Sequence, residues 1–213
     1  MKFLTLNTHS WMEKEAEEKF QLLLQDILDK DYDLICFQEI NQEMTSQEVE
    51  VNNHYQALPS AEPIHQDHYV RLLVEKLAEK GKNYYWTWAY NHIGYDRYHE
   101  GVAILSKTPI KAREILVSDV DDPTDYHTRR VALAETVVEG KELALASVHL
   151  SWWDKGFQGE WAKFESELLQ VETPLVLMGD FNNPVDYEGY QHIIQSPLAL
   201  QDSHKVADQT IGT

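Results

Sequence analysis

The sequence predicts an α/β protein of the α+β type, a four-layer sandwich in which two mixed β-sheets pack face to face and helices cover the outside. Two observations carry this prediction. Strand-like apolar runs alternate with amphipathic helical stretches along the chain, without repeats or low-complexity segments. The 213 residues, of which 43% are hydrophobic, can bury one substantial core, which predicts a single domain over residues 1–213.

The first half of the chain shows this alternation clearly. An apolar run over Phe3–Leu6 precedes a stretch in which apolar residues recur at three- and four-residue spacing, which predicts a helix over about residues 13–30. A second strand over Leu34–Phe37 follows directly, as expected after a crossover helix. Residues 41–64 are polar and predict a loop, and helical spacing returns over residues 68–80.

The second half supplies the remaining strands and helices. Tyr84–Trp88 is aromatic and β-prone, and Glu139-Gly140-Lys141 between two apolar runs predicts a hairpin. The other predicted elements are strands over 101–106, 131–138, 143–148 and 175–178 and helices over 161–170 and 187–195. Two sheets packed face to face with helices outside would use these parts.

Polar residues stand at the ends of five of the predicted strands. They are Asn7, Glu39, Glu100, His149 and the neighbouring pair Asp180 and Asn182. In open sheets with helical connections, ligands sit beyond the strand ends, so these residues could converge on one crevice. Taken singly, each has an ordinary structural interpretation, because Asp and Asn are common in turns and a lone His in an apolar strand is usually a core residue.

In order and approximate spacing, these residues resemble the endonuclease/exonuclease/phosphatase superfamily, which includes DNase I, abasic-site endonucleases, neutral sphingomyelinases and inositol-phosphate phosphatases. The opening segment Met1–Trp11 looks closest to the bacterial RgfB-like branch. The resemblance runs from residue 1 to about residue 204. It rests on the whole set, since each motif, such as Gly179-Asp180-Phe181-Asn182, is only two to four residues long.

The chain departs from this family near its end. Family members continue into an Ile-Asp-Tyr-Ile-like strand and a final Ser-Asp-His motif, which supplies an Asp–His pair to the active site. The sequence ends at Thr210–Thr213 with neither motif, and Asp202-Ser203-His204 has the wrong order. We expect Asp202 and His204 to be loop or strand-end residues without a functional role. The resemblance thus predicts a C-terminally incomplete domain, with little or no turnover by this 213-residue form.

Hydrolysis of a phosphoester requires a cation for the developing charge and an acceptor that orients the attacking water. Mg²⁺, with Mn²⁺ as the other candidate, prefers a few carboxylate oxygens and keeps several waters. Glu39 is the best single ligand, with Asn7 beside it, and the resemblance gives both residues the metal position. The chain is therefore predicted to be a Mg²⁺-dependent hydrolase of phosphoester bonds.

The other strand-end residues take catalytic roles in this prediction. Asp180 acts as the base or orients the water, and Asn182 holds the phosphate or the metal. His149 donates to the phosphoryl oxygen or the leaving group, while Glu100 fixes the tautomer of His149 and raises its pKa. The resemblance also implies that two residues touch the phosphate: Tyr98 and Arg129.

Charge discriminates among the substrates of this family. The 36 acidic and 18 basic residues leave a net charge of −18, which repels polyphosphate backbones at long range. Proteins that hold duplex DNA normally neutralise its phosphates with Lys and Arg, and the only adjacent pair of cations is Arg129-Arg130. We therefore predict a small-molecule or lipid-linked substrate. A nuclease, and a non-catalytic regulatory or binding protein on the same scaffold, remain alternatives.

Composition also indicates the cellular setting. No apolar run approaches the length of about 18 residues needed to span a bilayer, which predicts a cytoplasmic protein. The lone Cys36 lies in a strand and is predicted to be buried. The ten histidines form no recognisable zinc pattern. Trp152 and Trp153 follow His149 closely, and they could grip a lipid or an aromatic leaving group, or staple a loop to the sheet.

Overall fold

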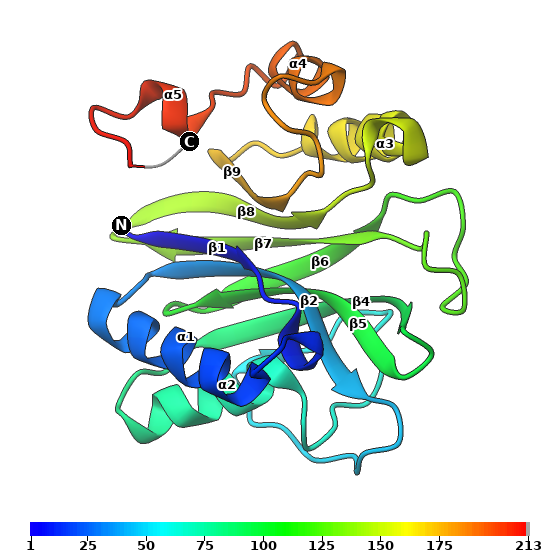
Figure 1. Ribbon diagram of the computed structural model, residues 1–213. Coiled ribbons are helices and arrows are strands. Elements are labelled where there is room, and N and C mark those ends of the chain that lie inside the picture. The colour runs from blue at the N-terminus through cyan, green and yellow to red at the C-terminus, as the bar shows by residue number, and fades with distance from the viewer. Residues whose placement is uncertain (212–213) are drawn as a thin grey trace.

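Two β-sheets pack face to face in the computed structural model, which describes residues 1–211, and helices cover both outer surfaces (Figure 1). The first sheet has the strand order β1-β2-β5-β4-β3, and the second has the order β6-β7-β8-β9. The predicted sandwich is therefore confirmed. Gly212 and Thr213, which end the predicted domain, lie outside the described residues.

Along the chain, helices separate some of these strands, and others follow one another directly. The first sheet contains β1 (Phe3–Asn7), β2 (Leu34–Glu43), β3 (Tyr55–Gln56), β4 (Tyr85–Gly94) and β5 (Tyr98–Ser106). The second contains β6 (Ile110–Leu116), β7 (Arg130–Val138), β8 (Lys141–His149) and β9 (Leu175–Asp180). The helices are α1 (Ala16–Lys30), α2 (Tyr69–Glu79), α3 (Phe157–Leu168), α4 (Glu188–Ile194) and α5 (Ser203–Val206), with short 3₁₀ turns at Ser10–Met12 and Trp153–Lys155.

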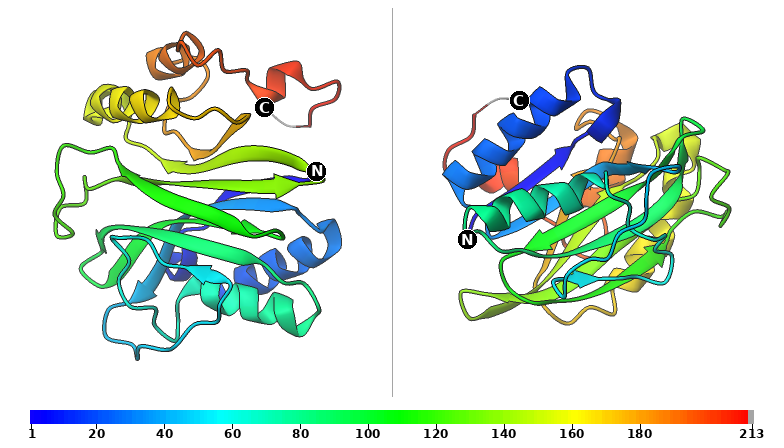
Figure 2. Two further views of the ribbon diagram at one scale, coloured as in Figure 1. Left: turned by 180° about the vertical axis from the view of Figure 1, so that it is seen from behind. Right: turned by 90° about the horizontal axis from the view of Figure 1, so that it is seen from below.

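Alternation along β2 explains why the layers form. Ile35 and Phe37 face α1 and α2, whereas Leu34 and Cys36 face the second sheet, and all four are fully buried. A strand buried on both faces needs a continuous apolar run, which is what this segment provides. On the other side, α3 covers the outer face of the second sheet (Figure 2), and its residue Trp161 packs in the same apolar cluster as residues of that sheet. Burial of Cys36, predicted from the sequence, is confirmed.

The connections bring several strand ends to one side. β1 pairs with β2 in parallel across α1, and β8 pairs with β9 in parallel across α3. The β7–β8 hairpin turns through Glu139 and Gly140, with φ values of 51° and 76°. Positive φ at both turn residues is the geometry that suits a two-residue hairpin, so the predicted hairpin is confirmed. β1 contacts β9 and β2 contacts β8 across the two sheets.

The predicted loop over residues 41–64 was wrong in part. Residues 41–64 are not simply a loop, because β2 runs to Glu43 and β3 pairs in parallel with β4. The polar Gln42 is buried in the strand, where its amide donates to the Pro63 carbonyl (2.7 Å) and accepts from the His65 N–H (2.8 Å). Near the end of the chain, Asp202 lies in a loop, as predicted, and caps the short helix α5, whereas His204 lies within that helix.

Among the described residues, no helix is long and apolar enough to cross a membrane.

Candidate active site

Strand ends from both sheets surround a cleft of about 740 Å³. Six of the eight residues predicted for the site line it: Glu39, Glu100, Arg129, His149, Asp180 and Asn182. Asn7 adjoins the cleft through hydrogen bonds to two of these residues. Tyr98 does not line it. The expected convergence of strand ends on one crevice is thus present in the structure.

A β-bulge directs Glu39 toward the cleft. The pairing of β2 with β5 shifts between Phe37 and Ile40, and Glu39 has a φ of 55°. Bulges of this kind re-aim a side chain, and positive φ in a non-glycine residue needs support from its surroundings. That support comes from Ser10, whose hydroxyl donates to the Glu39 carbonyl (2.7 Å).

Gly179 allows Asp180 to stand next to His149. Its φ is 143°, and a Cβ at this position would lie 2.1 Å from the Val148 carbonyl oxygen, so only glycine fits. β9 can therefore pair closely with β8, which places Asp180 opposite His149 in the parallel register. The backbone N–H of Asn182 then donates to Asp180 Oδ1 (2.9 Å).

Asn7 joins the carboxylates of the two sheets. Its Nδ2 donates to Glu39 Oε1 (2.8 Å) and to Asp180 Oδ2 (3.2 Å), and its Oδ1 accepts from the His9 N–H (3.2 Å). The amide nitrogen of Asn7, rather than its oxygen, therefore faces the two acids. Its predicted role as a metal ligand would require the amide to turn over, which exchanges two groups of the same shape.

Negative charge accumulates around Glu39. Burial, followed by the charges of Glu100 and Asp180, raises the pKa of Glu39. Among the described residues, two histidines lie within 4 Å of its carboxylate, with His9 Nε2 and His149 Nε2 each 3.9 Å from an oxygen. Within residues 1–211, no Lys or Arg forms an ion pair with the Glu39 carboxylate. A cation placed beside it would therefore be stabilised.

Arg129 fixes the tautomer of His149. Its Nη1 lies 3.4 Å from His149 Nδ1, and a guanidinium group can only donate. Nδ1 of the neutral ring must therefore accept, which leaves the proton on Nε2, the nitrogen that faces Glu39. Burial, and then the positive charge of Arg129, lower the pKa of His149 to about 4. His149 is thus a neutral N–H donor at pH 7.

The predicted action of Glu100 on His149 needs correction. Its charge does act to raise the pKa of His149, but burial and Arg129 outweigh it. The nearer partner of Glu100 is His92, whose Nε2 lies 3.5 Å from Glu100 Oε1. His92 Nδ1 lies 3.2 Å from the carbonyl oxygen of Thr128. Both ring nitrogens of His92 thus face oxygen atoms, one of the Glu100 carboxylate and one of the backbone.

The charge of His92 keeps Glu100 ionised. Burial alone would raise the pKa of Glu100, but the hydrogen bond and charge of His92, together with His149 and Arg129, hold it below its usual value. The sequence pattern did not indicate this role for His92. His92 lies seven residues before a second histidine, His99, and only the β4–β5 pairing shows which of the two meets Glu100.

Tyr98 does not reach the cleft, whereas Tyr95, three residues earlier, does. Tyr98 belongs to β5 and is buried, with the Arg97 guanidinium 5.0 Å above its ring. Tyr95 lies in the β4–β5 turn, is 63% exposed and lines the cleft. Its hydroxyl lies 3.1 Å from His9 Nε2. The sequence-based assignment of Tyr98 was wrong because Tyr98 lies within β5, whereas Tyr95, three residues earlier, lies in the exposed turn.

The two tryptophans after His149 have different environments. Trp152 is 51% exposed and lines the cleft. Trp153 packs against Phe157 and His192, with ring centroids 6.0 and 5.7 Å away. Each of the two interpretations drawn from the sequence therefore describes one residue, with Trp153 stapling the loop and Trp152 available to a ligand.

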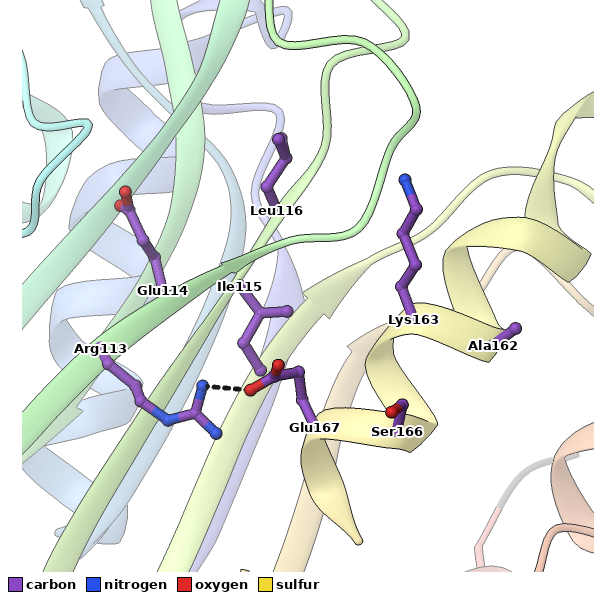
Figure 3. A pocket seen from close by; sticks show the side chains of 8 residues that line it. All are labelled: Arg113, Glu114, Ile115, Leu116, Ala162, Lys163, Ser166 and Glu167. Carbon is purple, nitrogen blue, oxygen red and sulfur yellow. Dashed lines mark hydrogen bonds and ion pairs between the residues drawn. The ribbon is translucent and has the colours of Figure 1, made fainter. Parts of the chain in front are cut away.

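A second hollow of about 610 Å³ lies between β6 and α3 (Figure 3). Across it, Arg113 Nη1 bonds to Glu167 Oε2 (3.0 Å). Lys163 is also paired, to the Ser118 carbonyl (2.6 Å) and to Asp119 (2.9 Å). Its cations are engaged by neighbouring groups, and none of the predicted site residues lies there. The strand-end cleft is therefore the stronger candidate.

The donor set of the cleft fits a hard cation with few protein ligands. Within residues 1–211, no three His, Cys, Asp or Glu side chains are grouped closely enough to hold a metal by themselves. Mg²⁺ does not require such a cage, because it binds through one or two carboxylates and keeps its waters. Glu39 and Asp180, joined by Asn7, offer that arrangement. Glu100 Oε2, in the same cleft, is buried without a hydrogen-bond partner.

Comparisons with known proteins point to one family. A model of the Endonuclease/Exonuclease/phosphatase family matches residues 12–210. An endonuclease/exonuclease/phosphatase family protein from Leptotrichia buccalis is 27% identical with a TM-score of 0.80, covering 98% of this chain and 76% of its own. The human Nocturnin catalytic domain with bound sulfate is 19% identical with a TM-score of 0.68, covering 94% and 70%. No curated protein matches the sequence.

A third similar structure is that of D. rerio TDP2 complexed with a single-strand DNA product. It is 13% identical with a TM-score of 0.56, and the match covers 92% of this chain and 64% of that one. At this identity, the likeness to TDP2, as to Nocturnin, concerns the fold.

Proposed function

This chain belongs to the Endonuclease/Exonuclease/phosphatase family, and we propose that it is a metal-dependent phosphoesterase. The substrate is a small or lipid-linked phosphoester, and the cation is Mg²⁺ or Mn²⁺. The observation that carries the proposal is the link made by Asn7, which bonds to Glu39 at 2.8 Å and to Asp180 at 3.2 Å. Two acids from different sheets are thereby held at one point of the cleft, beside the N–H donor His149.

Each side chain of the cleft has a task in hydrolysis. Asp180 accepts a hydrogen bond from the attacking water and orients it toward phosphorus. His149 presents Nε2–H to a phosphoryl or leaving oxygen, because Arg129 occupies its other nitrogen. A neutral donor suits this task at pH 7, since Nε2 already carries a hydrogen and the ring does not have to take up a proton first.

Glu39 and Asn7 would hold the cation. The cation supplies positive charge to the phosphoryl oxygens when bound. The raised pKa of Glu39 supports this assignment, because it reflects burial first and then the like charges of Glu100 and Asp180, and a bound cation would offset both. Asn182 supports the site indirectly, since its side-chain amide donates to the Leu150 carbonyl (2.8 Å) and its backbone N–H to Asp180.

We expect turnover by this chain to be slow. Asp202, which the sequence offers next to His204, accepts a hydrogen bond from Tyr190 (2.7 Å) and caps α5, which lies away from the cleft. Within residues 1–211, the cleft residues do not include a second Asp–His pair beside Glu39 and Asp180. Transition-state stabilisation then falls to His149 and Arg129, and missing one member of a catalytic set commonly costs several orders of magnitude in rate.

A panel of phosphoesters tests the proposal. The chain is assayed in Mg²⁺ with aryl and alkyl phosphates, phosphodiesters, a lysophospholipid and duplex DNA. We expect slow, metal-dependent release from a small ester, none from DNA at moderate salt, and loss in Asp180→Asn. Asp186→Asn is the matched control, because Asp186 is exposed in the loop after β9 and does not line the cleft. Equal rates in the two variants would contradict the proposal.

A further inference from the structure

Exposed aromatic side chains gather at the cleft. Among residues 1–211, five aromatic residues are exposed, and three of them line this one cleft: Tyr95, Tyr126 and Trp152. The other two are Phe3 on β1 and Tyr187 before α4. The three come from different segments, namely the β4–β5 turn, the loop before β7 and the turn after β8. Single exposed aromatics are common on protein surfaces, but three around one cleft call for an explanation.

Two of these rings are held in place from within the protein. The hydroxyl of Tyr95 contacts His9 Nε2 at 3.1 Å. The ring of Tyr126 lies 3.8 Å from that of His127, with 35° between their planes. Rings that are already ordered lose little conformational freedom when a ligand arrives, which favours binding. Trp152 carries the largest ring system of the three and is 51% exposed.

The charges of the cleft limit the size of the phosphorylated part of a ligand. Its lining includes two permanent cations, Arg129 and Lys155, against four acids: Glu39, Asp96, Glu100 and Asp180. With a net charge of −18 on the whole chain, these cations suit one phosphate rather than a phosphate backbone. The rest of the binding energy must come from the organic part of the ligand.

The chemistry of the rim favours a planar ring over an acyl chain. Phenol, indole and imidazole rings carry polar groups at their edges, and the lining also includes the polar residues Thr124, Asp96 and Lys155. An acyl chain would gain little from such edges, whereas a flat ring stacks on the faces and leaves the polar edges in water. We propose that Tyr95, Tyr126 and Trp152 form a stacking subsite for the planar aromatic part of a small phosphoester. This proposal rests on the proposed function and names its substrate class.

Two probes of equal charge and similar size test the subsite. Phenyl phosphate has a planar ring and cyclohexyl phosphate a puckered one, so their affinities, measured by calorimetry in Mg²⁺, separate stacking from simple apolar contact. We expect phenyl phosphate to bind more tightly by roughly 5- to 100-fold, the range of stacking on an aromatic side chain. Trp152→Ala should remove most of that preference, and Trp152→Phe should retain part of it. Tyr187→Ala, which changes an exposed aromatic away from the cleft, should leave it unchanged.

The outcomes separate this proposal from the proposed function. Equal affinities for the two probes, tighter binding of cyclohexyl phosphate, binding of neither probe, or a preference that survives Trp152→Ala and Tyr95→Ala together would overturn the stacking subsite. In each of these cases, Asp180-dependent hydrolysis of an alkyl phosphate would still support the proposed phosphoesterase function.

Discussion

Arg129 donates a hydrogen bond to Nδ1 of His149, 3.4 Å away, and thereby decides which nitrogen of that ring faces the cleft. A carboxylate facing Nδ1 would instead keep the hydrogen of the neutral ring on Nδ1, because a carboxylate accepts and cannot donate. Arg129 stabilises the tautomer with its hydrogen on Nε2, and its positive charge also lowers the pKa of His149. Its position on His149 makes it a positioning residue as well as a candidate phosphate ligand.

Replacing Arg129 by Met should therefore change His149. Without the guanidinium, the pKa of His149 should rise from about 4 toward its ordinary value of 6.5, and the ring should populate both tautomers. Nitrogen chemical shifts of the labelled ring measure both effects. We expect activity to fall by about 10- to 100-fold, the usual effect of removing an orienting partner. Arg129→Lys, which keeps the charge, should retain the low pKa. An unchanged tautomer in Arg129→Met would contradict this account.

Glu39→Gln should separate metal binding from stability. The pKa of Glu39 is raised in the folded protein, so its stabilising contribution is full below its unfolded pKa and is lost as the pH rises through the folded pKa. At pH 7 the ionised carboxylate therefore opposes folding. The amide should raise the melting temperature and abolish Mg²⁺ binding in calorimetry, where the wild type should bind with millimolar or weaker affinity. Glu43→Gln in the same strand is the control, and equal Mg²⁺ binding by wild type and Glu39→Gln would remove Glu39 from the site.

The ion pair of His92 and Glu100 should contribute to folding. His92→Phe leaves a buried carboxylate without its nearest cation, which should cost about 3 kcal/mol of unfolding free energy. Adding Glu100→Gln should recover much of that loss. The pKa of Glu100 is lowered, so its contribution is present above its unfolded pKa and disappears as the pH falls through the folded pKa. Urea titrations of the four proteins measure these values, and additive losses in the double variant would show that the two residues are not coupled.

His68 should make stability depend on pH. It caps α2 by accepting from the Arg71 N–H, and burial, followed by the charge of Arg71, lowers its pKa to about 3. Below pH 6.5, His68 binds a proton in the unfolded chain but not in the folded protein. The contribution of His68 to the free energy of unfolding is therefore full above that pH and falls toward pH 3. At pH 5, this difference in protonation of His68 lowers the free energy of unfolding by about 2 kcal/mol. His68→Asn keeps a capping acceptor, and its unfolding free energy should change less between pH 7.5 and pH 5. An identical change in both proteins would exclude a buried neutral His68.

The sequence predicted the site through its strand ends more reliably than through its loops. Apolar runs that stop at a polar residue identified Glu39, His149 and Asp180, because strand pairing leaves few choices for where such residues point. The parallel register of β8 with β9 then follows from Gly179, the one residue without a Cβ to block it. These features depend on residues that are close together in the sequence.

Loop side chains and partner choice could not be predicted in this way. Whether Tyr95 or Tyr98 reaches the cleft depends on where the β4–β5 turn begins. The partner of Glu100 is set by a register shift in the pairing of β4 with β5, between Tyr90 and His92. β6 escaped prediction because it is an edge strand in which charged residues such as Lys111 and Arg113 alternate with apolar ones. Each of these depends on contacts between segments that are distant in the sequence.

Hydrolysis in ¹⁸O-labelled water tests the central claim most directly. The best substrate of the phosphoester panel is incubated with the chain and Mg²⁺, and phosphorus NMR follows the isotope in the product. We predict one ¹⁸O atom in the released phosphate or phosphomonoester, because water oriented by Asp180 attacks phosphorus, and no release above background by Asp180→Asn or without the metal. Label in the alcohol, or equal release by Asp180→Asn and the wild type, would contradict phosphoester hydrolysis at this cleft.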